Sequence, residues 1–510
     1  MWPPSYNWPT GGAVLLEPRF GREVWRFQPP NDPDYLSTGG AVSFVPDLDG
    51  DGLHDCLVAD PGHITGIVIG TGSVFVLNGL TASVIREHFG STTGSVSLGG
   101  ENLGWSVLGI EDVTFDGRGD YVISSPLSDL GQGTRSNSGE IECFSGSTGG
   151  LVWRYSGQPN ELIGRALALG PDLTGDQIPE ILVDANGAYV GSERLGKVYI
   201  LDARTGNWLR TIDGLPVIGP LTPDFGSALG TSAHLDSDDI PDIVVGADNA
   251  SLAAGDGAGY VAAFSGSSGQ LLWRYDSEVP GARLGTSVSG LDDLDLDGYT
   301  EVLVGATAIS TYHPSGIGEA LVLSGKDGNL LWRIATSSAH YQAYGWIVRG
   351  YSVGGRLDHA LISEPSVGIL SDGAIHVVEF QPFLEPSDLS ISAAAGGIIH
   401  YQIDFPQSEA GLPYALLASA AGRGPTLLGG LLVPLTQDAA LSRCVANLYP
   451  PEFLLPRGIL DAQGDADAGL LIASGRLNGY IGRTIHLAAV TGISGTGRLS
   501  SIAAPLIVQP

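Results

Sequence analysis

The sequence predicts an all-β protein assembled from a repeated unit, on three observations. Glycine and proline are abundant, with 75 and 31 copies in 510 residues, which is typical of a chain rich in turns. Short β-branched runs alternate with clusters of Gly, Asp and Ser, whereas long segments with helical periodicity are missing. An acidic nine-residue segment recurs at intervals near 60 residues. The chain is too long for one ordinary domain, so we expect a repeat array or several domains.

The first acidic segment indicates a metal-binding loop between two strands. Asp47, Asp49, Asp51 and Asp55 stand at positions 1, 3, 5 and 9, and Gly52 at position 6 permits a sharp turn. The flanking residues are apolar and β-branched on both sides, so the loop joins two strands rather than two helices. A hard cation such as Ca²⁺ takes about six to eight oxygen ligands, and alternate side chains of a tight loop can supply several of them.

Copies of this loop define the repeat. They begin at Asp47, Asp112, Asp172, His234, Asp293 and Gly350, at intervals of 65, 60, 62, 59 and 57 residues. In each copy a strand of small residues precedes the loop, and further apolar strands follow it. The last strand often carries a Leu-Trp-Arg-aromatic pattern, as in Leu272–Tyr275. Such a period accommodates a four-stranded antiparallel sheet with its turns, which is one propeller blade.

The two ends of the repeat array predict how the ring closes. Val24–Phe27 has the last-strand pattern but precedes every first strand, and the sixth copy ends after its third strand, at Phe380. We therefore expect six blades, with the N-terminal strand completing the last one and removing the open edge. A seven-bladed ring is the alternative if Gly12–Phe27 forms part of a further, degenerate blade.

The repeat stops at residue 380 and a different pattern follows. We expect a β-propeller over residues 1–380, a linker over 381–386 and a β-sandwich over 387–510. Ile399, Tyr401, Ile403 and Phe405 alternate with polar residues, which predicts a strand with one buried face.

The candidate metal ligands are the oxygen-bearing side chains at positions 1, 3, 5 and 9 of five loops. Several like charges within nine residues repel one another without a cation. His234 stands at position 1 of the fourth loop, where imidazole suits softer metals than Ca²⁺. The sixth copy, with Gly350, Ser352, Gly354 and Asp358, has one carboxylate, so we expect no ion there. We expect about five Ca²⁺ sites, with these ligands: Asp47, Asp49, Asp51 and Asp55; Asp112, Thr114, Asp116 and Asp120; Asp172, Thr174, Asp176 and Glu180; Asp236, Asp238 and Asp242; Asp293, Asp295, Asp297 and Glu301.

Composition excludes some partners. Lys and Arg total 24 against 55 Asp and Glu, a formal charge of −31, so nucleic acid and anionic membrane surfaces are poor partners. No apolar run of about 18 residues exists, so we expect no membrane span. The N-terminus lacks the basic-then-apolar form of a signal peptide. Cys56, Cys143 and Cys444 are far apart, and either one disulfide or three buried thiols fits that spacing.

The repeat resembles the FG-GAP family, the β-propeller repeat also found in integrin alpha subunits. The first motif is literal in Phe225-Gly226 and looser in Leu103-Gly104, Leu284-Gly285 and Tyr344-Gly345; the second is seen in Val245–Ala247 and Val304–Ala306. The resemblance covers roughly residues 12–380. It implies a propeller with Ca²⁺ in the acidic loops, usually extracellular and serving binding or adhesion; integrin propellers have seven blades.

The C-terminal region is similar to a terminal β-domain of many large secreted bacterial proteins. The matching segments are Ala410–Leu417, Val433–Asp438, Gly458–Asp461 and Pro505–Val508. This similarity implies an exported protein, located outside the cell or at its surface.

The function that we expect is non-catalytic binding or adhesion, or a surface-structural role. The segments Pro126–Ser138 and Ala250–Gly257 vary most between copies and are candidates for contacting a protein or glycan ligand. Two alternatives remain. Leu201–Gly206 and Gly269–Trp273 resemble the tryptophan-docking repeat of quinoprotein dehydrogenases, which also use Ca²⁺. The chain is otherwise a subunit of a surface layer or filament that assembles through its C-terminal domain. No nucleophile elbow, zinc-protease motif or phosphate loop stands out.

Overall fold

The computed structural model describes most of the chain. The described residues are 11–17, 22–29, 34–91, 100–129, 137–219, 221–294, 298–307, 318–335, 344–353, 356–364, 374–380, 383–405, 409–424, 426–428, 431–492, 500–501 and 503–510, and the side chains of 335, 352–353, 356–358, 379 and 432 are not described. By its internal contacts the chain divides into two compact units, and the division falls within the repeats. One unit contains residues 1–231 and 240–287; the other contains residues 232–239 and most of the chain from 288 onward.

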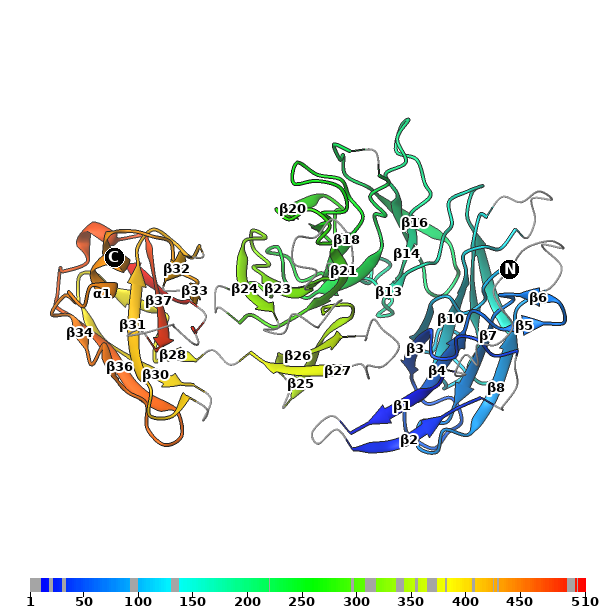
Figure 1. The fold of residues 1–510 in the computed structure, drawn as a ribbon, viewed down its shortest axis with the longest axis horizontal. Coiled ribbons are helices and arrows are strands. Elements are labelled where there is room, and N and C mark those ends of the chain that lie inside the picture. Colours follow the sequence, from blue (N-terminus) through cyan, green and yellow to red (C-terminus); the bar gives the residue numbers. More distant parts are fainter. Residues whose placement is uncertain are drawn as a thin grey trace. The chain divides into compact units, whose positions relative to one another are not determined.

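The fold is all-β, as predicted, and the repeats form blades of the propeller type (Figure 1). Five four-stranded sheets follow one another along the chain, and the strands of each sheet are hydrogen-bonded in chain order. They are β3 (Ala41–Val45), β4 (Asp55–Asp60), β7 (Ser73–Leu77) and β8 (Val84–Phe89); β9 (Val107–Ile110), β10 (Asp120–Ser125), β11 (Glu140–Phe144) and β12 (Leu151–Ser156); β13 (Leu167–Leu169), β14 (Ile181–Ala185), β15 (Lys197–Leu201) and β16 (Trp208–Asp213); β17 (Ala228–Ser232), β18 (Asp242–Ala247), β19 (Tyr260–Phe264) and β20 (Leu271–Asp276); β21 (Leu284–Gly290), β22 (Val302–Ala306), β23 (Glu319–Leu323) and β24 (Leu330–Ala335).

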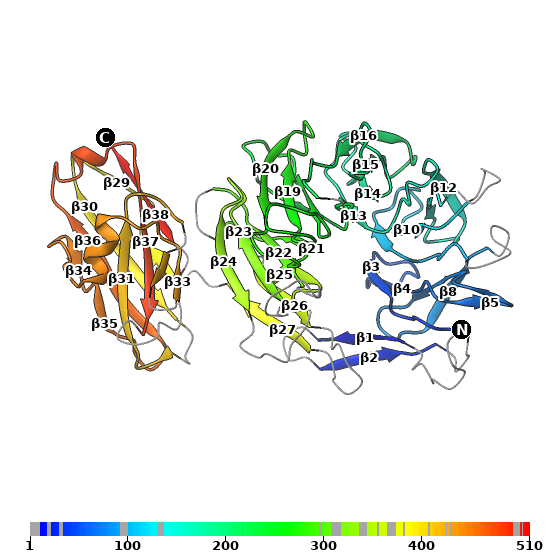
Figure 2. The same cartoon turned by 45° about the horizontal axis from the view of Figure 1, so that its top comes forward.

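Two incomplete sheets complete the repeat region. The sixth copy forms a three-stranded sheet of β25 (Val348–Val353), β26 (Arg356–Glu364) and β27 (Ala374–Glu379). At the N-terminus, β1 (Ala13–Leu16) and β2 (Glu23–Phe27) form a two-stranded sheet of their own (Figure 2). A small hairpin of β5 (Ile64–Thr65) and β6 (Val68–Ile69) extends the loop after β4.

Burial explains the composition of the strands. The second and third strands of a blade are buried along nearly their whole length, as in β4, β7, β18 and β19, which is why they read as continuous apolar runs. The fourth strand is half-exposed, but Trp153 of β12 and Trp273 of β20 are buried, and Trp332 of β24 is half-buried. In β12 the Nε1 of Trp153 donates a hydrogen bond of 2.8 Å to the carbonyl of Ala203, in the turn between β15 and β16.

The N-terminal strand forms a hairpin. β2, which was expected to complete the last blade, is hydrogen-bonded to β1 in the described part of the chain, and the closure of the ring stays a prediction. Trp25 Nε1 donates to the carbonyl of Gly79 at 2.8 Å, and Gly79 occupies the same place in the first blade as Ala203 does in the third. β2 therefore contacts the first blade as β12, the fourth strand of the second blade, contacts the third. The Trp pattern marks an outer strand but does not say which strand that outer strand hydrogen-bonds.

The glycine of the first motif has a steric cause. Gly104, Gly164, Gly226, Gly285 and Gly345 have φ between 83° and 96°, a region that side chains disfavour. A Cβ on Gly226 would also lie 2.7 Å from the Cβ of Asp184 in the neighbouring blade, so blades approach too closely there for any side chain.

The region after residue 383 consists of two sheets around one core. The four-stranded sheet has the order β28 (Leu384–Pro386), β30 (Gly397–Asp404), β36 (Asp465–Ile472), β34 (Phe453–Leu454). The five-stranded sheet has the order β29 (Ser390–Ser392), β38 (Ala504–Gln509), β37 (Thr484–Thr491), β31 (Pro413–Ser419), β35 (Arg457–Ile459). The alternating residues Ile399, Tyr401, Ile403 and Phe405 are all buried in the shared core, as predicted.

Three features of this region were not predicted. Leu384–Pro386 forms a strand paired with β30, so these residues of the expected linker 381–386 belong to the sheet, while 381–382 lie outside the described residues. A short helix, α1 (Ala439–Val445), follows the hairpin of β32 (Thr426–Leu428) and β33 (Leu431–Val433), and Asp438 caps it by accepting the backbone N–H of Leu441. A 3₁₀ turn, η2, spans Asn478–Tyr480.

The cysteines match one of the two expectations. Cys56, Cys143 and Cys444 are all buried free thiols, which is the second of the two readings of their spacing. Within the described ranges no helix is long and apolar enough to cross a membrane.

The steric account of the first motif gives a test. Gly226→Ala is expected to lower the free energy of unfolding by about 2–4 kcal/mol, because it combines a left-handed alanine with overpacking against Asp184. Gly191→Ala is the matched control: its φ is 62°, but nothing lies within 4 Å of the added Cβ, so it should cost only about 1–2 kcal/mol. Urea unfolding measures both, and equal losses would contradict the close approach of the blades.

Candidate metal centres

The first acidic loop brings three carboxylates together. It joins β3 to β4, and one carboxylate oxygen from each of Asp47, Asp49 and Asp51 lies within 4.8 Å of the others. Asp49 and Asp51 are exposed and Asp47 is half-buried, so the cluster opens to solvent. Hard oxygen donors in a solvent-exposed loop match the chemistry of Ca²⁺ rather than that of softer metals, so the donor set fits the predicted ion.

Donors from outside the loop surround this cluster. The side-chain amide of Asn78 donates to Asp49 Oδ2 at 2.7 Å and to Asp51 Oδ2 at 2.9 Å. Arg118 Nη1 donates to Asp47 Oδ2 at 3.1 Å. Partial burial opposes ionisation of Asp47, but the backbone N–H groups of Gly50 and Gly52 together with Arg118 hold the pKa of Asp47 below its usual value. The loop is thus arranged to keep negative charge.

The carboxylate at position 9 has a different environment. Asp55, Asp120, Glu180, Asp242 and Glu301 are at most 1% exposed. In the first blade, Asp55 Oδ2 accepts the N–H of Leu48 at 2.8 Å and Oδ1 accepts the N–H of Gly79 at 2.9 Å. The residue at position 9 therefore ties the acidic loop to the turn between the third and fourth strands of its own blade.

The same two contacts recur in the next two blades. Each position-9 carboxylate accepts an N–H from early in its loop and another from the later turn; the donors are Val113, Thr114 and Gly146 for Asp120, and Leu173, Thr174 and Ala203 for Glu180. For Asp242 the turn donor is Gly266 at 2.9 Å, and for Glu301 the loop donor is Leu294. Burial raises the pKa of Asp55, Asp120 and Glu180, although these backbone hydrogen bonds partly offset it.

The second and third loops share the backbone design of the first. Asp112 accepts the N–H groups of Asp116 and Gly117, and Asp172 accepts those of Gly175 and Gln177. Thr114 and Thr174 each donate their hydroxyl to the position-1 aspartate, at 3.3 and 3.4 Å. Among the described residues, three carboxylates within 4.8 Å of one another occur in the first and fourth loops and not in these two.

The remaining loops differ in what they show. In the fourth, oxygens of Asp236, Asp238 and Asp242 form the second close group, and His234 is not a member of it. In the fifth, Asp293 accepts the N–H of Gly298 at 2.8 Å, while Asp295 and Asp297 lie outside the described residues.

In the sixth copy the loop itself is gone. β25 and β26 pair from Val348↔Ile362 to Val353↔Arg356, so the chain turns back as a hairpin where the other copies carry the acidic loop. Gly350 pairs with Ala360 within this hairpin; Gly354 and the side chains of Ser352 and Asp358 are outside the described part. The assignment of metal to each of the other loops remains a prediction.

The turn between the third and fourth strands was missed by sequence reasoning. Its side chains reach the carboxylate at position 5: Asn78 contacts Asp51, Ser145 and Ser147 donate to Asp116, and Arg204 donates to Asp176. The hydrogen bond from Ser147 is the largest of the causes that lower the pKa of Asp116. The recurring turns Ser145–Gly149 and Ser265–Gly269 were visible in the sequence, but nothing in one sequence links them to a loop some 30 residues away.

Comparisons with known proteins agree with this architecture. The family model PQQ_2, described as Outer membrane protein assembly factor BamB, matches residues 137–354. Integrin alpha-2 of Mus musculus is 24% identical over 237 residues, which is 44% of this chain and 18% of that protein. Integrin alpha-7 of Homo sapiens is 32% identical over 151 residues (28% and 12%), and integrin alpha-V of Gallus gallus is 28% identical over 225 residues (42% and 20%).

These similarities confirm the resemblance to the integrin alpha, FG-GAP type of propeller. The chain spans a fifth or less of the length of the curated relatives that it matches.

The two kinds of carboxylate can be separated by mutation. In the presence of EDTA, Asp55→Ala is expected to lower the free energy of unfolding by about 2–5 kcal/mol, because it leaves two buried N–H groups without an acceptor. Asp51→Ala removes an exposed side chain and should change stability by less than about 0.5 kcal/mol in chelator, while reducing the stabilisation that Ca²⁺ adds. Urea unfolding with EDTA and with Ca²⁺ measures both, and equal effects of the two variants in EDTA would contradict the tie formed by Asp55.

A buried carboxylate outside the loops predicts a pH dependence. Asp184 in β14 is fully buried; Oδ1 accepts the N–H of Ala166 at 2.8 Å, and Oδ2 has no hydrogen-bond partner within the described residues. Burial raises its pKa from 3.8 to about 7. Folding therefore favours the protonated form, and this contribution to stability is present at low pH and lost as pH rises toward 7.

Asp184→Asn removes this titration. The stability of Asp184→Asn relative to the unmodified chain is expected to increase between pH 4 and pH 8, by on the order of 2–4 kcal/mol. Chemical unfolding of both proteins at the two pH values measures the difference in their free energies of unfolding. The titration of all other groups is common to both proteins and drops out of this difference. A difference that is independent of pH would show that Asp184 ionises normally in the folded protein.

Proposed function

We propose that this chain is an extracellular or cell-surface binding protein whose propeller is stabilised by Ca²⁺ and which recognises a protein or glycan ligand through variable loops. The observation that carries the proposal is the group of Asp47, Asp49 and Asp51 in a loop type that recurs from blade to blade. The similarity to integrin alpha chains supports the adhesion-type role.

The ion has a structural role in this proposal. Asp47, Asp49 and Asp51 would hold it at the turn between the first two strands of the blade. Bound Ca²⁺ supplies positive charge that offsets the repulsion of the carboxylates and fixes the loop.

The proposed ligand surface lies away from the ions. The acidic loop precedes the second strand of a blade, and the variable loop follows that strand, so the two are at opposite ends of it. In the second blade these ends are Asp120 and Ser125 of β10, and the loop beginning at Pro126 follows. In the fourth blade Ala250–Gly257 follows β18, and Leu252 and Gly255 bridge each other to close the loop.

A second candidate function has one observation in its favour. The PQQ_2 match over residues 137–354 is consistent with a propeller enzyme of the quinoprotein dehydrogenase type. Turnover of alcohols after addition of pyrroloquinoline quinone and Ca²⁺ would favour this candidate over a binding protein.

Calcium should stabilise the folded chain. At about one hundred times its Kd each bound ion adds roughly 2.7 kcal/mol to the free energy of unfolding, so the melting temperature should rise clearly on going from EDTA to millimolar Ca²⁺. Mg²⁺ is the control, since it demands stricter geometry and should stabilise less. Thermal unfolding followed by circular dichroism measures this, and equal melting temperatures in Ca²⁺ and EDTA would refute the proposal.

Ligand binding is expected to depend on the variable loops. Replacing residues 250–257 with a Gly-Ser segment of equal length should abolish binding to any ligand found on a glycan or extracellular-protein array, while the melting temperature in Ca²⁺ stays within a few degrees. Replacing the exposed turn Asn478–Tyr480, which lies outside the repeats, in the same way is the control. Unchanged binding after loop replacement would place the ligand elsewhere.

A further inference from the structure

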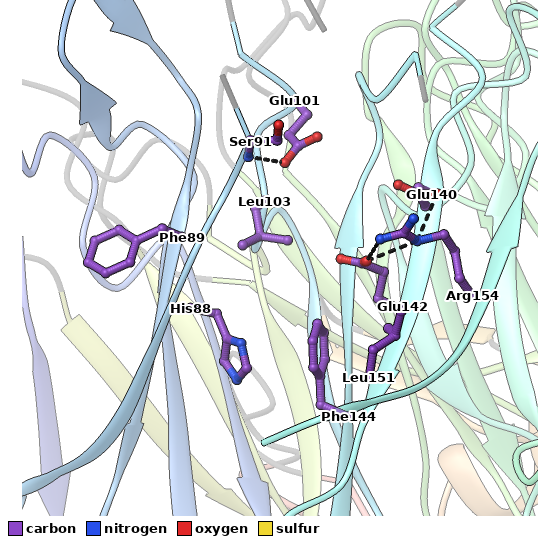
Figure 3. Close-up of a pocket in the computed structure, with 10 residues that line it drawn as sticks. All are labelled: His88, Phe89, Ser91, Glu101, Leu103, Glu140, Glu142, Phe144, Leu151 and Arg154. Carbon is purple, nitrogen blue, oxygen red and sulfur yellow. Dashed lines mark hydrogen bonds and ion pairs between the residues drawn. The ribbon is translucent and has the colours of Figure 1, made fainter. Parts of the chain in front are cut away.

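A pocket of about 290 Å³ lies between the first two blades (Figure 3). β8 supplies one side, and β11 and β12 supply the other. Its polar lining contains three carboxylates, from Glu101, Glu140 and Glu142, and one guanidinium, from Arg154. It lies outside the acidic loops.

Among the residues that the structure describes, the charges in the pocket are not balanced. Arg154 forms ion pairs with Glu140, at 3.1 Å between Nε and Oε1, and with Glu142, so one cation serves two carboxylates. Glu101 lies apart from Arg154, beside Ser91, and accepts the backbone N–H of Ser91 (Figure 3). Within the described residues Glu101 forms no ion pair. Burial raises the pKa of Glu101 and of Glu140, which is the expected consequence of carboxylates with too little positive charge nearby.

Aromatic rings and an apolar side chain form the remainder of the lining. The rings of His88 and Phe144 lie 4.4 Å apart between centroids, and Leu103 is nearby. Burial, with Arg86 as a second cause, lowers the pKa of His88 to about 4, so the imidazole is neutral near pH 7. Its Nε2 is hydrogen-bonded to the hydroxyl of Tyr121 at 2.7 Å. This wall therefore offers ring surface without positive charge.

We propose that this pocket binds a primary alkylammonium group, with the ammonium among Glu101, Glu140 and Glu142 and the alkyl stem against His88 and Phe144. The lining is rich in hydrogen-bond acceptors, and its guanidinium already pairs with two carboxylates, so the complementary ligand is a cationic donor. An anion would meet a net negative charge. The aromatic faces also attract a cation.

The size of the pocket limits the ligand. Its volume is at the lower end of the range for ligand pockets, about 300–1,000 Å³, so it suits one amino-bearing chain rather than a larger ligand. Two sources share this chemistry: a free alkylamine and a lysine side chain of a protein.

The pocket adjoins one of the variable loops. Ser128 Oγ donates to Glu140 Oε2 at 3.2 Å, and the N–H of Leu127 donates to the carbonyl of Glu101 at 3.3 Å. The inference therefore deepens the proposed function, and it rests on that function in assigning the pocket to the ligand-binding rim.

Titration with n-butylammonium chloride tests the pocket. Calorimetry of the full chain in saturating Ca²⁺ should show saturable binding, which Glu101→Gln weakens about tenfold by removing one charged acceptor. Glu193→Gln is the matched control, because Glu193 is an exposed carboxylate outside the pocket lining, and it should bind like the unmodified chain. n-Butanol, which has the stem without the charge, should not bind.

Three results would overturn the proposal: no saturable binding, equal binding by both variants, or equal binding of n-butanol. Peptides containing lysine or acetyl-lysine then distinguish the sources. Preferential binding of the lysine peptide over n-butylammonium identifies a protein side chain, and binding of the free amine alone identifies a small molecule. Loss of amine binding with an intact Ca²⁺ effect on melting refutes the pocket alone, whereas the absence of a Ca²⁺ effect refutes the proposed function.

Discussion

The blades depend on one buried interaction, the carboxylate at position 9 of the acidic loop. In the first blade Asp55 accepts an N–H from its own loop and another from the turn after the third strand. This tie joins two turns that are separated by more than 20 residues, and Asp120 and Glu180 repeat it. Since neither donor is otherwise satisfied by strand pairing, the free energy of folding contains this contact whether or not an ion is bound.

The hydrogen bonds at position 9 also determine which carboxylates of the acidic loop face solvent. Once position 9 is committed to the backbone, the carboxylates at positions 1, 3 and 5 remain at the open side of the loop, where Asp47, Asp49 and Asp51 converge. Neighbouring side chains donate hydrogen bonds to these carboxylates. Asn78 donates to Asp49 and Asp51. Arg118, from the acidic loop of the next blade, donates to Asp47. The sixth copy has only the carboxylate at position 9, Asp358, and its first two strands pair as a hairpin where the other copies carry the loop.

Local chemistry made much of this predictable. The spacing of the acidic residues from Asp47 to Asp55 predicted the loop, and the recurrence of that loop predicted the blades. The alternation of apolar residues from Ile399 to Phe405 predicted a strand with one buried face. Contacts between distant segments were not predictable, because one sequence does not say which turn meets which loop; Asn78 and Gly79 are examples. The hydrogen bonds of Asp55 were not predictable for the same reason, since its neighbours Leu48 and Gly79 are known only from the fold. The pairing of β2 with β1 depended on Ala13–Leu16, a strand too short to recognise by pattern.

The central claim is that carboxylates such as Asp49 hold calcium and thereby brace the blades. Equilibrium dialysis of the full chain against Ca²⁺, followed by metal analysis, measures the number of ions directly. The account predicts about five ions for the unmodified chain and one fewer for Asp49→Ala, with the other loops still occupied. The same ion count in both proteins, or no bound Ca²⁺ in either, would contradict it.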